Sequence, residues 1–209
     1  MKKLLLASNG EFLIKKGYDL LGIPREQIKI AYIITASKAA SDKKFLDIHK
    51  ESMKEQGLNF EEIDIEGKTK EELYKLLDGK NVIHIEGGNT FYLLKAVKES
   101  GFDQVLKDMV SRGIAYVGTS AGAYIACPTI ETSMWGPKIR DQYGLTDFTA
   151  LNFVPFLLWV HYKDDMEGLI REKMKTTSLP VRILRDGQGI LVENDSYTFV
   201  GEGEEIRLL

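Results

Sequence analysis

Ser120 lies where a short apolar run gives way to a run of small residues. With Gly118 and Gly122 it forms a G-x-S-x-G pattern, which is typical of the sharp strand-to-helix turn that exposes a serine nucleophile. Such a turn leaves almost no room for a side chain two residues before or after the serine. The N–H groups at the start of the following helix would stabilise the negative charge of an acyl-transfer intermediate. The same pattern also fits an ordinary tight turn in which Ser120 caps the helix.

The three histidines of the chain are the candidates for a base that activates Ser120. His49 falls in a polar helical stretch and is expected to be solvated, whereas His84 falls inside an apolar strand and is expected to be a hydrogen-bonded core residue. His161 ends an apolar run and begins a polar loop, as expected of a general base that must be both fixed and accessible. We therefore predict His161 as the base, with a structural role as the alternative.

A second loop with residue types suited to this chemistry follows the apolar run at 81–86. Its two glycines would let a backbone N–H approach a reacting carbonyl closely. We predict that a backbone N–H of this loop forms a two-donor oxyanion hole with the N–H of Ala121. The next two residues, Asn89 and Thr90, are candidates for substrate binding and also suit the cap of the following helix.

The elements that must position these residues alternate between apolar strands and amphipathic helices. This alternation predicts a three-layer α/β fold, in which a mostly parallel central sheet carries helices on both faces. Ligands bind at the carboxyl ends of the strands in such a sheet. The predicted strands are 3–8, 28–35, 59–65, 81–86 and 114–119, and the predicted helices are 12–21, 41–56, 69–77, 93–97 and 103–112.

The pattern changes after the helix that follows Ser120. Three short apolar segments near the end of the chain are separated by Asp186-Gly187 and Asn194-Asp195, which predicts antiparallel strands joined by tight turns. No linker or repeat interrupts the sequence, so we predict a single domain over residues 1–209. The other predicted segments are an irregular stretch at 128–146, a strand at 153–160, a helix at 164–175, and the antiparallel strands at 181–185, 189–193 and 196–200.

The composition of the chain limits the classes of function. Its 209 residues are 44% hydrophobic, which suffices for one sizeable core. A net charge of −3 without a Lys/Arg cluster argues against a nucleic-acid partner, and no apolar run approaches the roughly 20 residues of a membrane span. The single cysteine, Cys127, allows no internal disulfide and is expected in the core. We expect a cytoplasmic enzyme.

Several motifs resemble those of peptidase family S51, the serine peptidases of the aspartyl dipeptidase and cyanophycinase group. The fold of that family is like that of the class I glutamine amidotransferases, so the resemblance implies the same fold here. The motifs follow in the family's order: Gly-Gly-Asn-Thr-Phe at 87–91, Gly-Thr-Ser-Ala-Gly-Ala at 118–123, Ala-Cys-Pro-Thr-Ile at 126–130, and Ala-Leu-Asn-Phe-Val-Pro at 150–155, which leads to His161. The resemblance implies Ser120 as nucleophile, His161 as base, and Gly88 with Ala121 as oxyanion donors.

The carboxylate that orients the histidine is where the chain departs from the family. In the aspartyl dipeptidases this carboxylate lies just after a Thr-x-Thr motif, where the present chain has Trp135. The nearby carboxylates are Glu131 and Asp141, which would equally suit a solvated loop. We predict that at most one of them supports His161, and Asp141 is favoured because it follows a flexible Gly-Pro turn.

The resemblance also bears on the substrate. Family dipeptidases prefer an acidic residue on the amino side of the cut bond, which calls for a cation in the site. Arg171, in the helix predicted after His161, is the candidate, with Lys175 behind it, and a solvated helix face is the alternative.

The function implied is therefore a serine peptidase without metal or cofactor, which hydrolyses small peptides, including those with an acidic N-terminal residue, as a monomer or homodimer. One alternative is a catalytically weakened or non-catalytic binding protein, because Trp135 stands where the family has its acid. Another is an amidotransferase-type hydrolase of side-chain amides, which is less favoured because such enzymes normally use a thiol nucleophile.

Overall fold

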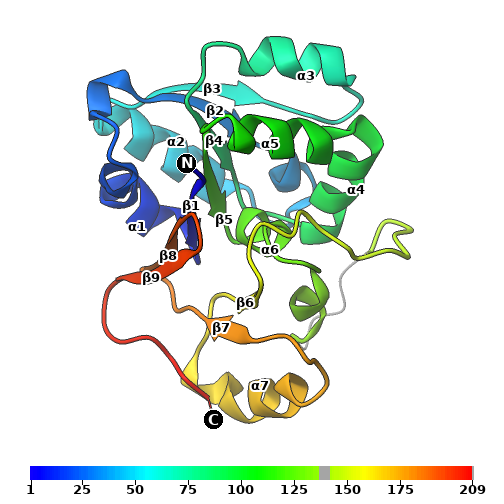
Figure 1. Cartoon of the computed structure of the whole chain (residues 1–209). Coiled ribbons are helices and arrows are strands. Elements are labelled where there is room, and N and C mark those ends of the chain that lie inside the picture. Colours follow the sequence, from blue (N-terminus) through cyan, green and yellow to red (C-terminus); the bar gives the residue numbers. More distant parts are fainter. Residues whose placement is uncertain (137–141, 209) are drawn as a thin grey trace.

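A seven-stranded sheet in the order β3-β2-β4-β5-β1-β8-β9 forms the centre of the molecule (Figure 1). The computed structural model describes residues 1–136 and 142–208 of the chain. Neighbouring strands from β3 to β1 pair in parallel, and β8 and β9 add an antiparallel hairpin beside β1. The strands are β1 Lys3–Ala7, β2 Lys29–Ile33, β3 Asn59–Ile63, β4 Val82–Ile85, β5 Ala115–Thr119, β8 Gln188–Glu193 and β9 Ser196–Gly201. The predicted mostly parallel α/β fold is confirmed.

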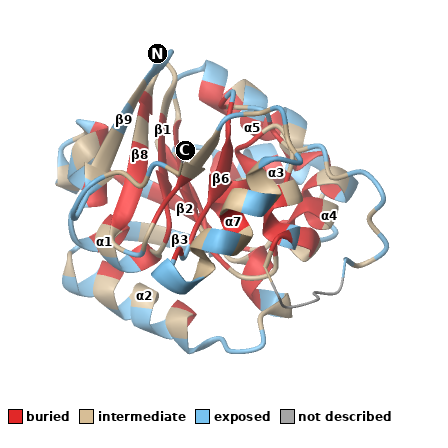
Figure 2. Cartoon of the chain, turned by 90° about the horizontal axis from the view of Figure 1, so that it is seen from below, coloured by how far each residue is buried: buried red, intermediate tan, exposed pale blue. Residues whose placement is uncertain are grey.

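Helices cover both faces of this sheet, and two hydrophobic clusters lie between the layers (Figure 2). Successive strand residues point to opposite faces, so Leu4 and Leu6 pack in one cluster while Leu5 and Ala7 pack in the other. Helices α3 to α6 contribute to the first cluster, and α1 and α2 to the second. The helices are α1 Gly10–Lys15, α2 Lys44–Glu55, α3 Lys70–Leu77, α4 Thr90–Ser100, α5 Phe102–Ser111, α6 Ala121–Ile125 and α7 Glu167–Met174.

Short 3₁₀ turns occupy several positions where the sequence predicts strand ends or continuous helix. The predicted helix 12–21 is divided between α1 and a 3₁₀ turn, because the helix ends at Lys15. The predicted helix 164–175 likewise begins with one 3₁₀ turn before α7. The 3₁₀ turns are Gly17–Leu21, Arg25–Gln27, Thr35–Ala39, Glu131–Met134 and Asp164–Met166. No helix in the described part of the chain is both long and apolar enough to cross a membrane.

One strand prediction near the C-terminus is wrong. The segment at 181–185 was expected to join the antiparallel set, but β7 (Val181–Ile183) pairs in parallel with β6 (Leu157–Trp159) in a separate two-stranded sheet. A parallel pair needs a long crossover, and α7 supplies it between β6 and β7. The β8–β9 hairpin is antiparallel as predicted, with Asn194 at φ 55° in its turn.

Candidate active site

Ser120 occupies the abrupt turn between β5 and α6. Its backbone has φ 49° and ψ −102°, a positive-φ conformation outside the left-handed helical region that non-glycine residues adopt only when the surrounding structure enforces it. Both flanking glycines are required by packing. A Cβ on Gly118 would lie 2.5 Å from the carbonyl oxygen of Gly122, and a Cβ on Gly122 would lie 2.1 Å from the carbonyl oxygen of Ile85. The two glycines thus allow the sharp turn that places Ser120 at the carboxyl end of β5.

The carboxyl ends of β1, β4 and β5 lie side by side at this point. Gly118 is paired with Leu6 of β1 and with Ile85 of β4, and the Ser120 N–H donates to the carbonyl oxygen of Ala7 at 3.0 Å. The loops that follow these three strands are therefore brought together around the serine hydroxyl. This is the edge at which parallel α/β sheets bind ligands.

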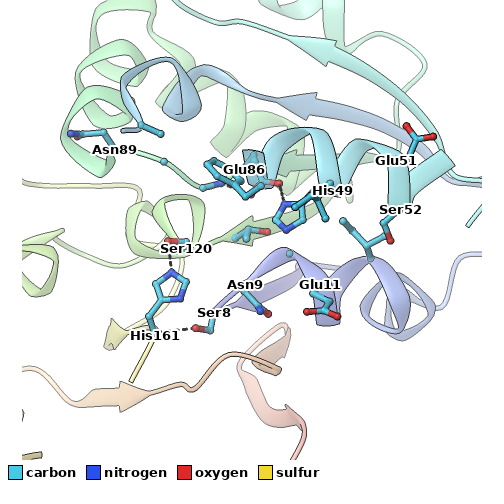
Figure 3. Close-up of a pocket in the computed structure, with 18 of the residues that line it drawn as sticks. Ser8, Asn9, Glu11, His49, Glu51, Ser52, Glu86, Asn89, Ser120 and His161 are labelled. Atoms are coloured by element: carbon cyan, nitrogen blue, oxygen red, sulfur yellow. Dashed lines mark hydrogen bonds and ion pairs between the residues drawn. The ribbon is translucent and has the colours of Figure 1, made fainter. Parts of the chain in front are cut away.

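Three side chains from distant segments form a continuous hydrogen-bonded chain at this edge. Ser120 Oγ lies 3.0 Å from His161 Nε2, and His161 Nδ1 lies 2.6 Å from Asp186 Oδ1. Asp186 Oδ1 also accepts a hydrogen bond of 2.9 Å from the Ser8 hydroxyl, which itself accepts the His161 N–H at 2.8 Å. Figure 3 shows the His161 ring directed at Ser120. This order of hydroxyl, imidazole and carboxylate is that of a serine hydrolase triad.

Asp186 is the member of this chain that sequence reasoning missed. The pair Asp186-Gly187 was interpreted only as a turn between strands, whereas its carboxylate faces the imidazole. The hydrogen bond from His161 lowers the pKa of Asp186, an effect that outweighs the partial burial of the carboxyl. The sequence does place this carboxylate at the end of a predicted strand downstream of His161, where a catalytic acid could lie. No local pattern, however, distinguishes such an acid from an aspartate in an ordinary turn.

Two loops that follow β6 and β7 are held together, and this brings His161 close to Asp186. The Leu184 N–H donates to the carbonyl oxygen of Trp159 at 2.8 Å, and the Tyr162 N–H donates to that of Leu184 at 3.1 Å. His161, between these bonds, has φ 59°. The pairing of β6 with β7 therefore places His161 and Asp186 next to each other.

The glycine loop after β4 lies beside the serine. A Cβ on Gly87 would be 3.3 Å from the Ser120 Cβ. Gly88 has φ 143°, and a Cβ there would be 2.2 Å from the carbonyl oxygen of Ala36, so only glycine fits. The Asn89 side chain caps α4 by accepting the N–H groups of the second and third helical residues at 2.9 and 3.0 Å.

A cavity of about 1160 Å³ opens in front of these groups (Figure 3). Its inner end is formed by Ser120, His161 and the glycine loop, and its side walls come from α1 and α2. His49 and Glu86 lie in the wall, where His49 Nδ1 is 2.9 Å from Glu86 Oε2. The cavity therefore gives a ligand direct access to the serine hydroxyl.

The family model for peptidase family S51 matches residues 4–200. The chain belongs to peptidase family S51. An uncharacterised peptidase of Pasteurella multocida (strain Pm70) is 32% identical over 204 residues, which cover 96% of this chain and 98% of that protein. A peptidase E of Nostoc sp. (strain PCC 7120) is 31% identical over 219 residues, which cover 96% of this chain and 86% of that protein.

The fold of this S51 peptidase is shared with a solved structure. A crystal structure of a candidate peptidase E protein from Listeria monocytogenes EGD-e matches with a TM-score of 0.85 over 97% of this chain and 100% of that one, at 24% identity. That likeness shows the fold alone. Together with the relatives named peptidase E, the family match makes the chain a serine-type peptidase hydrolase.

The other residues predicted for the site lie in different surroundings. The Glu131 carboxylate accepts a hydrogen bond of 3.2 Å from the Thr129 hydroxyl, and Asp141 lies outside the described residues. Trp135 is buried and stacks on Trp159, with 6.3 Å between ring centroids. The carboxylate that contacts His161 in the described structure is Asp186, not Glu131. The role of Asp141 stays a prediction.

The predicted substrate-binding residues differ in their access to the cavity. Asn89 belongs to its lining, but Thr90 is 1% exposed and its buried hydroxyl has no hydrogen-bond partner in the described structure. Arg171 lies on α7, where its Nε is 2.9 Å from the Glu167 carboxylate, and it is not among the described residues that line the cavity. The structure therefore does not bring Arg171 to the serine.

The remaining nucleophile and base candidates have clear positions. His84 is buried as predicted, with its ring nitrogens 2.7 Å from the Tyr18 hydroxyl and 2.8 Å from that of Thr119, and burial lowers its pKa to about 4. The expectation of a solvated His49 is wrong, because α2 turns that face toward the cavity and the side chain is only 13% exposed. Cys127 is in the core, where burial raises the pKa of its thiol to about 12. No group of three potential metal ligands occurs among the described residues.

Proposed function

We propose that this S51 peptidase hydrolyses small peptides through an acyl-enzyme on Ser120, with His161 as general base and Asp186 as the carboxylate that orients it. The observation that carries the proposal is the chain of contacts from Ser120 Oγ to His161 Nε2 at 3.0 Å and from His161 Nδ1 to Asp186 Oδ1 at 2.6 Å. Both distances are within the range needed for proton transfer to and from a positioned imidazole.

Each group has one task in the proposed reaction. As Ser120 Oγ attacks the peptide carbonyl carbon, its proton passes to His161 Nε2. Asp186 accepts the Nδ1–H, which keeps Nε2 free to take that proton and stabilises the imidazolium. The imidazolium then gives the proton to the leaving amine as the C–N bond breaks. A water molecule, activated in the same way, hydrolyses the Ser120 ester and regenerates the hydroxyl.

The negative oxygen of the tetrahedral intermediate would be stabilised by the N–H groups of Gly88 and Ala121. Ala121 is the first residue of α6, where N–H groups have no partner within the helix. Gly88 follows the residue whose Cβ would be in contact with Ser120. Preorganised donors of this kind typically contribute about 10²–10³-fold to kcat each.

The size of the cavity supports a small substrate. Its volume of about 1160 Å³ is comparable with the upper end of the roughly 300–1,000 Å³ that small-ligand pockets occupy. The predicted preference for an acidic first residue has no support from Arg171, which lies away from the described lining. We therefore propose small peptides as the substrate class and assign no preference for their first side chain.

The two alternatives are less well supported. The case for a binding protein rested on Trp135 in the place of the acid, but His161 has a carboxylate partner in Asp186. The case for a side-chain amidase required a thiol nucleophile, and Cys127 is fully buried with a raised pKa.

The test is reaction with a fluorophosphonate, followed by mass spectrometry of the peptides. Labelling of Ser120 that is lost in Ser120→Ala and in His161→Ala is the result expected, because both the nucleophile and its base are needed. A scan of dipeptides and tripeptides with varied first residues then identifies the substrates. No labelling at any pH would favour the binding protein instead.

A further inference from the structure

Glu86, a buried carboxylate outside the proposed triad, directly precedes the glycine loop that faces Ser120. It is 0% exposed, and its two oxygens accept hydrogen bonds from three donors. Oε2 accepts from the Tyr32 hydroxyl and from His49 Nδ1, the latter at 2.9 Å, while Oε1 accepts from the N–H of Gly87 at 2.5 Å. Burial raises the pKa of Glu86, but the bonds and charges of the neighbouring histidines and Tyr32 outweigh it and bring the pKa to about 2. An ionised carboxylate is thus kept in the interior at neutral pH.

Burying a charged group costs free energy unless hydrogen bonds and opposite charges compensate it, so the Glu86 carboxylate needs several donors around it. Its compensation comes from two elements. Tyr32 belongs to β2, and His49 belongs to α2 in the cavity wall. These two donors fix the carboxylate, and the carboxylate in turn holds the N–H of Gly87.

The peptide group between Glu86 and Gly87 and the one between Gly88 and Asn89 are both anchored. On one side, the Gly87 N–H is bound by Glu86 Oε1. On the other side, the Asn89 N–H donates to the carbonyl oxygen of Ala36 at 3.0 Å. The peptide group between them carries the Gly88 N–H, and Gly87 and Gly88 have no side chain to restrict its rotation, so its direction depends on these two anchors.

We propose that Glu86, fixed by Tyr32 and His49, is a positioning residue that directs the Gly88 N–H toward the oxyanion formed at Ser120. The inference rests on the proposed function, because it needs an oxyanion at that place. Without the acceptor at residue 86 the peptide group between residues 86 and 87 can rotate, the loop loses one of its two anchors, and the Gly88 N–H turns away from the reacting atom. Stabilisation of the transition state then falls, while groups that bind the ground state elsewhere in the cavity are unchanged.

Two substitutions at residue 86 separate the acceptor from the charge. Glu86→Gln keeps an oxygen for the Gly87 N–H, and its amide group can face Tyr32 and His49, which are both able to accept as well as donate. Glu86→Met has a similar shape and no acceptor. We expect the glutamine variant to retain most of the function and the methionine variant to lose it.

A matched pair of tyrosines tests the same idea from further away. Tyr32 and Tyr18 are both fully buried, and each hydroxyl has one buried partner. The partner of Tyr32 is Glu86, whereas that of Tyr18 is His84 Nδ1. Tyr32→Phe therefore loosens the carboxylate that holds the loop, and Tyr18→Phe removes a comparable buried bond that does not touch it.

The measurement is the rate of phosphonylation of Ser120 by a fluorophosphonate, resolved into reagent affinity and maximal rate. In that reaction the Ser120 Oγ–P bond forms, the P–F bond breaks, fluoride leaves, and the serine proton passes to His161. The phosphoryl oxygen takes the oxyanion position, so the maximal rate reports the donors. Because loss of one oxyanion donor costs about 10²–10³-fold, we expect the misdirected donor of Glu86→Met to lower the maximal rate by about 10- to 100-fold with unchanged affinity.

The remaining variants complete the test. Glu86→Gln should stay within about fivefold of wild type, Tyr32→Phe should be slowed about three- to tenfold, and Tyr18→Phe should be unchanged, since each loses less than a whole donor. Thermal melts establish that each variant is folded. If Glu86→Met does not fold, the two tyrosine variants decide.

Two results would overturn the inference alone. Wild-type labelling of Ser120 combined with equal maximal rates for folded Glu86→Met and Tyr32→Phe would overturn it and leave the proposed function intact. Equal slowing of Tyr18→Phe and Tyr32→Phe would show that any buried bond matters and would also reject a specific role for Glu86. Failure to label wild-type Ser120 would instead overturn the proposed function, and this inference with it.

Discussion

Replacing Asp186 by asparagine perturbs the proposed base while keeping its shape. The carboxylate accepts the His161 Nδ1–H at 2.6 Å and the Ser8 hydroxyl at 2.9 Å. Both bonds end on Oδ1. An amide oxygen in that place keeps both bonds but lacks the charge that stabilises the imidazolium. An NH₂ group in that place instead favours the imidazole tautomer with its proton on Nε2, which cannot accept the proton of Ser120, so either orientation lowers kcat.

The size of the loss follows from how exposed the pair is. The equivalent change in a chymotrypsin-like protease costs about 10⁴-fold in kcat. Here the side chains of His161 and Asp186 are 46% and 57% exposed, so water partly screens the loss of the carboxylate charge. We therefore expect kcat to fall about 10³-fold, which corresponds to about 4 kcal/mol in the activation free energy. KM should change little, because Asp186 is not among the described residues that line the cavity.

The assay is steady-state hydrolysis of any small peptide that the wild type turns over, with a thermal melt to establish folding. Glu131→Gln is the matched control, because the Glu131 carboxylate accepts a hydrogen bond from Thr129. This variant should keep kcat within about threefold of wild type, far from the 10³–10⁴-fold effect of a triad acid. A kcat for Asp186→Asn within tenfold of wild type, or an equal loss in Glu131→Gln, would refute the assignment of Asp186.

Three further outcomes are expected. Ser8→Ala removes a donor to Asp186 and the acceptor of the His161 N–H. Loss of these two hydrogen bonds should lower kcat about tenfold or more, and an unchanged kcat would contradict this. Gly122→Ala should lower Tm and abolish labelling of Ser120, because its Cβ would meet the Ile85 carbonyl. The control Gly168→Ala in α7 has nothing within 4 Å of its Cβ and should raise Tm slightly. Equal Tm values for the two variants would contradict the tight packing inferred at Gly122. Glu86 has a folded-state pKa of about 2, below its ordinary 4.5, so its contribution to stability is complete above about pH 4.5 and is lost as the pH falls toward 2. Urea unfolding at pH 5 and pH 3 should therefore show a larger loss of unfolding free energy for wild type than for Glu86→Gln, and equal losses would show that Glu86 does not titrate this way.

The sequence by itself was enough to predict the parallel sheet and the serine turn. Strands buried on both faces form nearly continuous apolar runs in the sequence, and β4 and β5 are entirely buried. The turn at Ser120 likewise depends on local sterics, since a Cβ on Gly118 would meet the carbonyl oxygen of Gly122. Features that arise from a residue and its near neighbours leave a pattern in the sequence, and these two did.

Only the tertiary structure determined which carboxylate supports His161. Asp186 is 25 residues from His161 in the chain, and its Asp-Gly pair has the same local appearance as a turn. It reaches the imidazole because β7 pairs in parallel with β6, a pairing that the sequence pattern did not distinguish from an antiparallel one. His49 was likewise expected in solvent, since helical periodicity does not reveal that a buried Glu86 lies opposite. Contacts between distant segments depend on strand order and helix packing, and these are properties of the whole fold rather than of any local run of residues.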